Sequence, residues 1–300
     1  MTDFALTTLM YHYVRAPGDR AEAGSGIPGL SPERFAAQLD SFVQHYTMIA
    51  WPDLRAYLLG LRALPPNACL LTFDDGTCDH YINVFPSLRE RGLSGLFFAL
   101  ARQPGDGLAL GHKIHFLLAR LGVDDLRAAL WEQLAPEQRL AYAQAESHYR
   151  ARGEEWAVEL LKSVLQRDLS IPADSILSDL FAAHIGDEVR MAGEYYLTNA
   201  QIAEMRAHGM HFGGHSRSHP WFDWVSVEEQ ADEIDASAAW LRTLAPGPFA
   251  FAYPYGGYNA ESSRLLQAHG FVAAFTTIAR VEQSDRFFIG RFDGEALADD

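Results

Sequence analysis

The sequence contains little cysteine, few basic residues and no long apolar run. Its only cysteines, Cys69 and Cys78, lack the C-x-x-C spacing of zinc and redox motifs, and we expect no disulfide between them. No stretch approaches the ~20 apolar residues that a membrane-spanning helix needs. The first residues also carry no basic and apolar leader pattern. We therefore expect a cytoplasmic protein without a membrane-inserted segment.

The charge balance of the chain is strongly acidic. The 300 residues include 24 Lys and Arg against 39 Asp and Glu, which gives a formal net charge of −15. A surface of this sign repels phosphate backbones and anionic lipid headgroups, so we expect no nucleic-acid partner. The length suits one large domain or a domain with an insertion, and a hydrophobic content of 48% suits a full core.

Two short segments concentrate residues that can carry chemistry. An apolar run stops abruptly at Asp74 and Asp75, which is typical of a buried strand that delivers charge at its carboxyl end. Much further along the chain, His215 and His219 form a His-x-x-x-His pair. Two imidazoles and the carboxylate of Asp75 predict a metal site with open positions for water and substrate. Asp74 is then left beside the metal as a general base.

Each of the two segments also has a simpler interpretation. Asp-Asp-Gly is a common turn after a strand, and two of the twelve histidines could lie on the surface. A single helical turn would place residues four apart on one face. The neighbouring Gly213, Gly214 and Pro220 indicate a shaped loop instead of exposed side chains. The occurrence of both segments in one chain favours the metal site.

Strand-like and helix-like segments alternate over roughly 1–100 and 195–300, which predicts parallel strands joined by right-handed crossovers. We expect Ser31 to cap a first helix that starts at Pro32. A Gly- and Pro-rich loop should precede it over 17–30. The expected strands are 4–11, 46–50, 69–73, 95–100, 195–198, 210–214, 249–253, 272–276 and 286–292.

Residues 101–194 differ from the rest of the chain. Helical patterns dominate there and strand-like runs are missing, so we expect a helical insertion within a single domain of residues 1–300. The insertion should shape the substrate entrance or form a homo-oligomer contact. The expected helices are 113–121, 124–134, 136–147, 154–169 and 176–185.

Three segments of the chain together resemble the motifs of a known family. Thr72–Gly76, His215–His219 and Phe251–Gly256 are similar, in this order, to the first three motifs of the polysaccharide deacetylases, the NodB-homology domains of carbohydrate esterase family 4. The form of the third motif and the early Tyr11-His12 resemble the poly-N-acetylglucosamine and surface-polysaccharide deacetylases. The resemblance implies an α/β fold, a distorted (β/α) barrel.

The resemblance also implies roles for the residues of the first two motifs. Asp74 would be the general base, and Asp75, His215 and His219 would bind one divalent transition metal. Zinc is our first expectation, and cobalt, nickel and iron also suit two imidazoles and a carboxylate.

The third motif implies a part in substrate binding. The backbone N–H near Tyr255, after Pro254, would stabilise the oxyanion of a tetrahedral intermediate. A tight Pro-Tyr-Gly-Gly turn without a chemical role is the simpler alternative. Tyr253, Tyr255 and Tyr258 could offer ring faces on which a sugar stacks, although such rings more often pack in a core.

The chain departs from the family's pattern at two places. Ala252 stands where the third motif usually has an arginine that contacts the base, and Arg291 could supply that charge from the last strand. The family's late Leu-x-His, which supplies the general acid, is absent. His12 at the end of the first strand is our candidate for the proton donor that an amine leaving group needs.

The resemblance implies a hydrolase that removes an acetyl group from an N-acetylated sugar, in the biosynthesis of bacterial surface polysaccharide such as O-antigen or capsule. The two departures leave room for an O-acetyl esterase or a non-sugar amide hydrolase on the same scaffold. A catalytically inactive carbohydrate-binding relative is the alternative from another class. The presence of all four motif residues, Asp74, Asp75, His215 and His219, argues against it.

Overall fold

The structure is a computed structural model that describes residues 4–16, 27–150, 156–163, 165–166 and 173–297. The chain divides into two compact units. The larger unit is formed by the described residues of 4–16, 28–103 and 195–297, and the smaller one by Ile27 and the described residues of 104–194.

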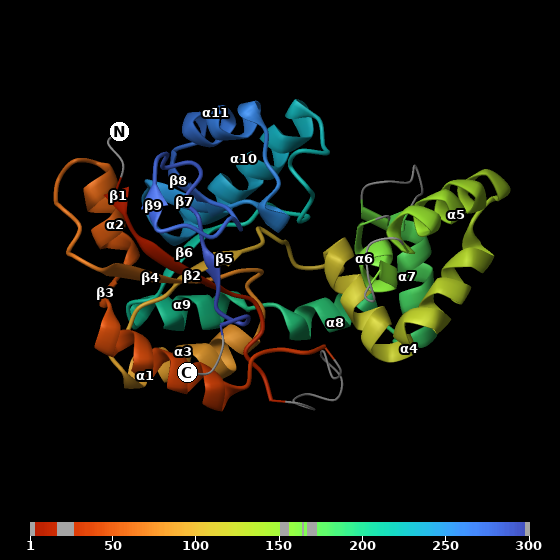
Figure 1. The fold of residues 1–300 in the computed structure, drawn as a ribbon, viewed down its shortest axis with the longest axis horizontal. Coiled ribbons are helices and arrows are strands. Elements are labelled where there is room, and N and C mark those ends of the chain that lie inside the picture. The colour runs from red at the N-terminus through yellow and green to blue at the C-terminus, as the bar shows by residue number, and fades with distance from the viewer. Residues whose placement is uncertain (1–3, 17–26, 151–155, 164, 167–172, 298–300) are drawn as a thin grey trace. The chain divides into compact units, whose positions relative to one another are not determined.

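A curled, parallel sheet forms the centre of the larger unit (Figure 1). Every neighbouring pair in this sheet is parallel, and the curled sheet forms a half-barrel, which confirms the predicted α/β class and distorted (β/α) barrel. The strand order is β10 (Phe292–Asp293), β2 (Thr7–Tyr11), β4 (Ala68–Phe73), β5 (Leu96–Ala99), β6 (His211–Gly214), β7 (Phe249–Ala252) and β8 (Phe271–Phe275), with β3 (Thr47–Ile49) beside β4. A separate antiparallel pair consists of β1 (Phe4–Ala5) and β9 (Glu282–Gln283).

The segment before β10 connects the two edges of the curled sheet. Ile289 forms a parallel bridge with Phe275 of β8, and Phe292 pairs with Leu9 of β2. Arg291 lies between these two contacts. The strand expected over 286–292 is therefore wrong in extent: only its last residue belongs to β10, and the remainder is a loop with one isolated bridge.

Alternate residues of the strands belong to two different apolar clusters, as strand geometry requires. Leu71 and Phe73 of β4 pack in a cluster with the helices, whereas Leu70 packs in a second cluster with Phe98. In Figure 1, α1, α3 and α9 lie below the sheet, and α10 and α11 lie above it. The helices of this unit are α1 (Pro32–His45), α2 (Trp51–Leu58), α3 (Phe85–Glu90), α9 (Asn199–Ala207), α10 (Val227–Leu244) and α11 (Ala260–Ala268).

Local signals in the sequence set several helix ends. The side chain of Ser31 accepts a hydrogen bond from the N–H of Arg34, and Pro32 occupies the first helical position, as predicted. Thr198 caps α9 in the same way and forms a capping box with Gln201. Both cysteines are free thiols, as expected.

Tyr195 does not begin a strand, so the prediction for 195–198 is wrong. The residue ends α8 (Glu188–Tyr195), whose buried residues Met191, Ala192 and Tyr195 recur at helical spacing. Tyr196 contributes only an isolated antiparallel bridge to Thr77. Two tyrosines and a leucine favoured a strand, but burial of Tyr195 against Tyr13 is satisfied equally well from a helix end.

The smaller unit contains helices, as expected for this part of the chain. They are α4 (Leu110–Gln133), α5 (Pro136–Arg150), α6 (Trp156–Ser163), α7 (Ala173–His184) and most of α8. The helices predicted over 113–121 and 124–134 both occur within α4, where the non-helical Gly122 (φ 77°, ψ 174°) separates two helical segments. Parts of the expected helix 154–169 and of the expected loop 17–30 lie outside the described residues. The predicted insertion within one domain remains a prediction.

Among the described residues, none of the helices combines the length and the apolar character that crossing a bilayer requires.

Candidate metal centre

Two adjacent carboxylates follow β4, at the carboxyl end of the parallel sheet. The N–H of Asp74 still donates to the carbonyl of Tyr11 on β2 (2.9 Å), so this residue continues the ladder. Asp75 then takes a left-handed conformation (φ 74°) and Gly76 follows with φ 67°. Any Cβ at Gly76 would overlap Ala99. This sharp turn sends the neighbouring carboxylates to different partners.

The two histidines of the His-x-x-x-His pair are held in a loop after β6. Nδ1 of His215 donates to the carbonyl of Ala252 at the end of β7 (2.8 Å). Ser216 (φ 66°) and His219 (φ 63°) are both left-handed, so the pair lies in a shaped loop, as Gly213, Gly214 and Pro220 indicated, and not on a helical turn. Hydrogen bonds hold the loop in this conformation. Oγ of Ser216 accepts from the N–H of His219 (3.0 Å), and the carbonyl of Ser216 accepts from the N–H of Ala101 (2.9 Å).

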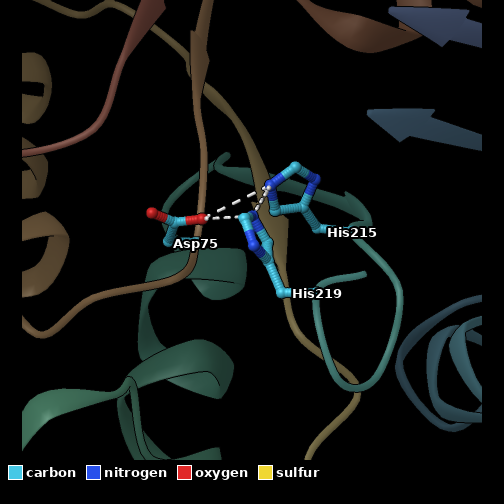
Figure 2. A group of neighbouring side chains, drawn as sticks. All are labelled: Asp75, His215 and His219. Atoms are coloured by element: carbon cyan, nitrogen blue, oxygen red, sulfur yellow. Dashed lines mark hydrogen bonds and ion pairs between the residues drawn. The ribbon is translucent and has the colours of Figure 1, made fainter. Parts of the chain in front are cut away.

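Asp75, His215 and His219 converge on one point (Figure 2). Oδ1 of Asp75 lies 3.3 Å from Nε2 of each histidine, and the two Nε2 atoms are 3.2 Å apart. Ligands at the ~2.0–2.1 Å bond lengths of tetrahedral zinc are separated by about 3.3 Å. Because Nδ1 of His215 carries its proton, its Nε2 presents a lone pair to the cluster. The lone pair of His215 and the facing carboxylate of Asp75 repel each other unless a cation lies between them, so this donor set fits a metal ion.

The acidic neighbours also change the proton affinity of His215. Burial alone would lower its pKa, but the carboxylates of Asp75 and Asp74 hold the pKa above its ordinary value. A proton and a metal ion would therefore compete for the same nitrogen, so a metal held there would bind more weakly at acid pH.

Asp74 faces Arg291, which joins it from the segment before β10. The guanidinium forms a bidentate pair with the carboxylate, with Nη1 and Nη2 each 2.7 Å from one oxygen, and both side chains are buried. Burial alone would raise the pKa of Asp74, but Arg291 and, more weakly, His215 and His12 bring it below its ordinary value. Asp74 is thus held as a carboxylate. Ala252 of the third motif carries no charge, and the positive charge beside Asp74 belongs to Arg291.

The segment that carries His12 is fixed from two sides. Its N–H and that of Tyr13 donate to Oε1 of Glu295 (2.8 and 3.0 Å). Its carbonyl accepts from Nε2 of His80 (2.9 Å). Burial lowers the pKa of His80 to about 4, so this ring is neutral and acts as a donor to the carbonyl. The imidazole of His12 remains 36% exposed, with Nδ1 3.9 Å from Glu295.

Two tyrosines of the third motif lie in different surroundings, Tyr255 beside the cluster and Tyr253 in the core. Tyr255 is left-handed (φ 57°), and its ring meets that of His219 edge-on at 4.5 Å between centroids. Tyr253 is fully buried and packs against Phe251 and Phe288, so the prediction that its ring stacks on a sugar is wrong. Pro254 begins a short 3-10 turn and is buried. The oxyanion role of the backbone near Tyr255 remains a prediction.

Three residues near the cluster were missed by the sequence reasoning. Trp221 stacks on Tyr255 with 4.4 Å between ring centroids and 9° between planes. Glu295 holds the backbone of His12, and Glu233 of α10 accepts three hydrogen bonds from the loop between the histidines. Only Trp221 has a signal in the sequence, an aromatic residue directly after His219-Pro220. Glu233 stands among other acidic residues of α10 that the sequence does not distinguish from it.

The chain is similar to several known proteins. Residues 181–274, which include both histidines, match the family model described as polysaccharide deacetylase. A Streptococcus pyogenes deacetylase, PplD, solved with acetate, is 17% identical, with a TM-score of 0.60 over 97% of this chain and 93% of that one. IcaB from Ammonifex degensii is 21% identical, with a TM-score of 0.57 over 96% and 91%.

A de-N-acetylase from Aggregatibacter actinomycetemcomitans also has this fold, with 13% identity and a TM-score of 0.60 over 98% of this chain and 97% of that one. A search by sequence among proteins of curated function gave no match. These structural likenesses concern the fold, while the family model covers the loop of the two histidines. The chain therefore resembles the polysaccharide deacetylase family in sequence over residues 181–274 and shares a fold with solved deacetylases over nearly its whole length.

Proposed function

We propose that the protein is a metal-dependent N-deacetylase that removes an acetyl group from an N-acetylated sugar in the biosynthesis of a bacterial surface polysaccharide. The observation that carries the proposal is the convergence of Asp75, His215 and His219 beside a carboxylate that Arg291 keeps ionised. The match to the polysaccharide deacetylase model supports the reaction class. The relative named a de-N-acetylase supports an amide as the bond that is cleaved.

Asp75, His215 and His219 would hold the metal, for which zinc is our first choice. Bound there, a divalent transition metal supplies Lewis-acid polarisation of a carbonyl and acidifies water. Asp74, ionised at neutral pH, accepts the proton of the attacking water as general base. Arg291 orients that carboxylate through two hydrogen bonds and keeps it unprotonated until it accepts the proton of the water. The stacked Tyr255 and Trp221 form an aromatic wall beside His219 for the sugar ring.

The experiment that tests this proposal combines metal analysis with acetate release. We expect the purified protein to contain a transition metal at one ion per chain and to release acetate from oligomers of N-acetylglucosamine. Chelation should reduce release to background, and added Zn²⁺ should restore it. An O-acetylated sugar is the matched control substrate. Acetate release from that ester alone would show an esterase instead of an amidase. Glycan binding without acetate release would show a carbohydrate-binding protein without this activity.

His12 is our proposed proton donor to the amine leaving group. Its imidazole is partly exposed and close enough to Asp74 to lower the pKa of that carboxyl group. Changing His12 to alanine should lower kcat for the N-acetyl sugar by ~10²-fold or more. The same variant should cleave an activated aryl acetate at nearly the wild-type rate, because a phenolate departs without a proton. Equal losses on both substrates would show that His12 does not act as the acid.

A further inference from the structure

The loop between the two histidines has a backbone that needs external support. Ser216 and His219 are both left-handed, although neither is glycine. Such conformations are uncommon for residues with a side chain and persist only where the surroundings hold them. The two histidines also differ in how they are fixed. His215 is buried and bonded through Nδ1 to Ala252, whereas His219 ends the loop and its ring lies against Tyr255.

Glu233 is the side chain that holds this loop. Its Oε2 accepts from the N–H of Arg217 (2.6 Å) and the N–H of Ser218 (2.9 Å). Its Oε1 accepts from Oγ of Ser218 (2.6 Å). Hydrogen bonds to a carboxylate are shorter and stronger than those between neutral groups. The single carboxylate of Glu233 thus binds Arg217 and Ser218, the two residues that lie between Ser216 and His219.

The anchor for these contacts is a helix that is itself fixed in the core. Glu233 lies on α10, and its neighbours Ile234, Ala238 and Leu241 are buried in the main apolar cluster. The helix therefore gives the loop a fixed point that lies outside the ligand set. Through Ser218 and the turn that closes on Ser216 Oγ, this point determines where the N–H, and hence the ring, of His219 lies.

We propose that Glu233 is a positioning residue of the metal centre: it holds the loop so that Nε2 of His219 lies opposite Asp75 and His215, and so determines how tightly the metal binds. This inference rests on the proposed function, because it takes these three residues as metal ligands. Residues that orient metal ligands typically change metal affinity by ~10- to 100-fold when they are replaced.

The test is a titration of the metal-free protein with Zn²⁺ in competition with a chromophoric chelator. Changing Glu233 to alanine should weaken the affinity by ~10- to 100-fold. Glu233→Gln keeps an oxygen that can accept the two N–H groups but loses the charge, so its affinity should lie between those of alanine and wild type. Asp232→Ala is the matched control, since it removes one exposed charge from the adjacent position of α10 and should leave the affinity unchanged.

The melting temperature of the metal-free variants separates positioning from general stability. A purely structural role would lower the melting temperature of Glu233→Ala and leave the Zn²⁺ affinity of the folded protein as in the control. That result, or equal affinities for Glu233→Ala and Asp232→Ala, overturns the inference while the proposed function stands. If the wild-type protein binds no Zn²⁺, the metal centre of the proposed function fails and the inference fails with it.

Discussion

Changing Asp74 to asparagine should lower kcat by ~10²- to 10⁴-fold, the usual contribution of a general base. Asparagine has nearly the same shape but cannot accept the proton of the attacking water at neutral pH. Metal binding should persist, because Asp74 faces Arg291 and the proposed metal ligands are Asp75, His215 and His219. The measurement is acetate release from an N-acetylated sugar oligomer, together with the metal content of the same sample.

A second buried Asp–Arg pair in the same region offers a matched control. Asp79 accepts from Nε of Arg15 at 2.5 Å, and both side chains are almost fully buried. Asp79→Asn therefore disturbs a comparable ion pair without removing the proposed base. It should reduce stability but leave kcat per folded molecule close to that of the wild type. If Asp74→Asn kept its turnover, or lost no more of it than Asp79→Asn, the role of base would have to go to another residue.

Much of this site could be predicted from the sequence, because its parts lie at strand ends and in short ordered motifs. Asp74 and Asp75 follow an apolar run, and parallel strands bring their carboxyl ends to one edge of a sheet. Arg291 could be proposed because the third motif lacks a charge at Ala252. The structure brings its guanidinium to Asp74 through the segment that joins the two edges of the sheet.

Other features depend on contacts between distant segments, which periodicity does not report. The loop of His215 and His219 avoids a helical turn because Glu233 and Ala101 bind its backbone from outside. The sequence contains the same four-residue spacing in either case. Tyr253 is a residue for which the motif misled, since its place there suggested contact with substrate. Alternation along β7 and the turn after it bury its ring instead among Phe251, Phe222 and Phe288.

Changing Arg291 to methionine should destabilise the protein by ~3–5 kcal/mol, the usual cost of leaving one member of a buried ion pair alone. Arg291 is fully buried and also donates through Nε to the carbonyl of Thr276 (2.9 Å). Methionine fills a similar volume, so the loss reports mainly the unpaired carboxylate of Asp74. The measurement is the free energy of unfolding in urea, determined on metal-free protein so that differences in metal binding do not enter.

The double variant Asp74→Asn with Arg291→Met distinguishes the ion pair from a packing effect. The double variant contains no unpaired buried carboxylate, so its free energy of unfolding should be higher than that of Arg291→Met alone. Residues in direct contact typically couple by ~0.5–3 kcal/mol. Additive effects in this cycle, or a cost below ~1 kcal/mol for Arg291→Met, would contradict the pairing. A strong coupling would instead mean that the charge of Arg291 keeps Asp74 ionised. Burial alone would raise the pKa of this carboxyl group and so oppose the charge that the proposed general base needs.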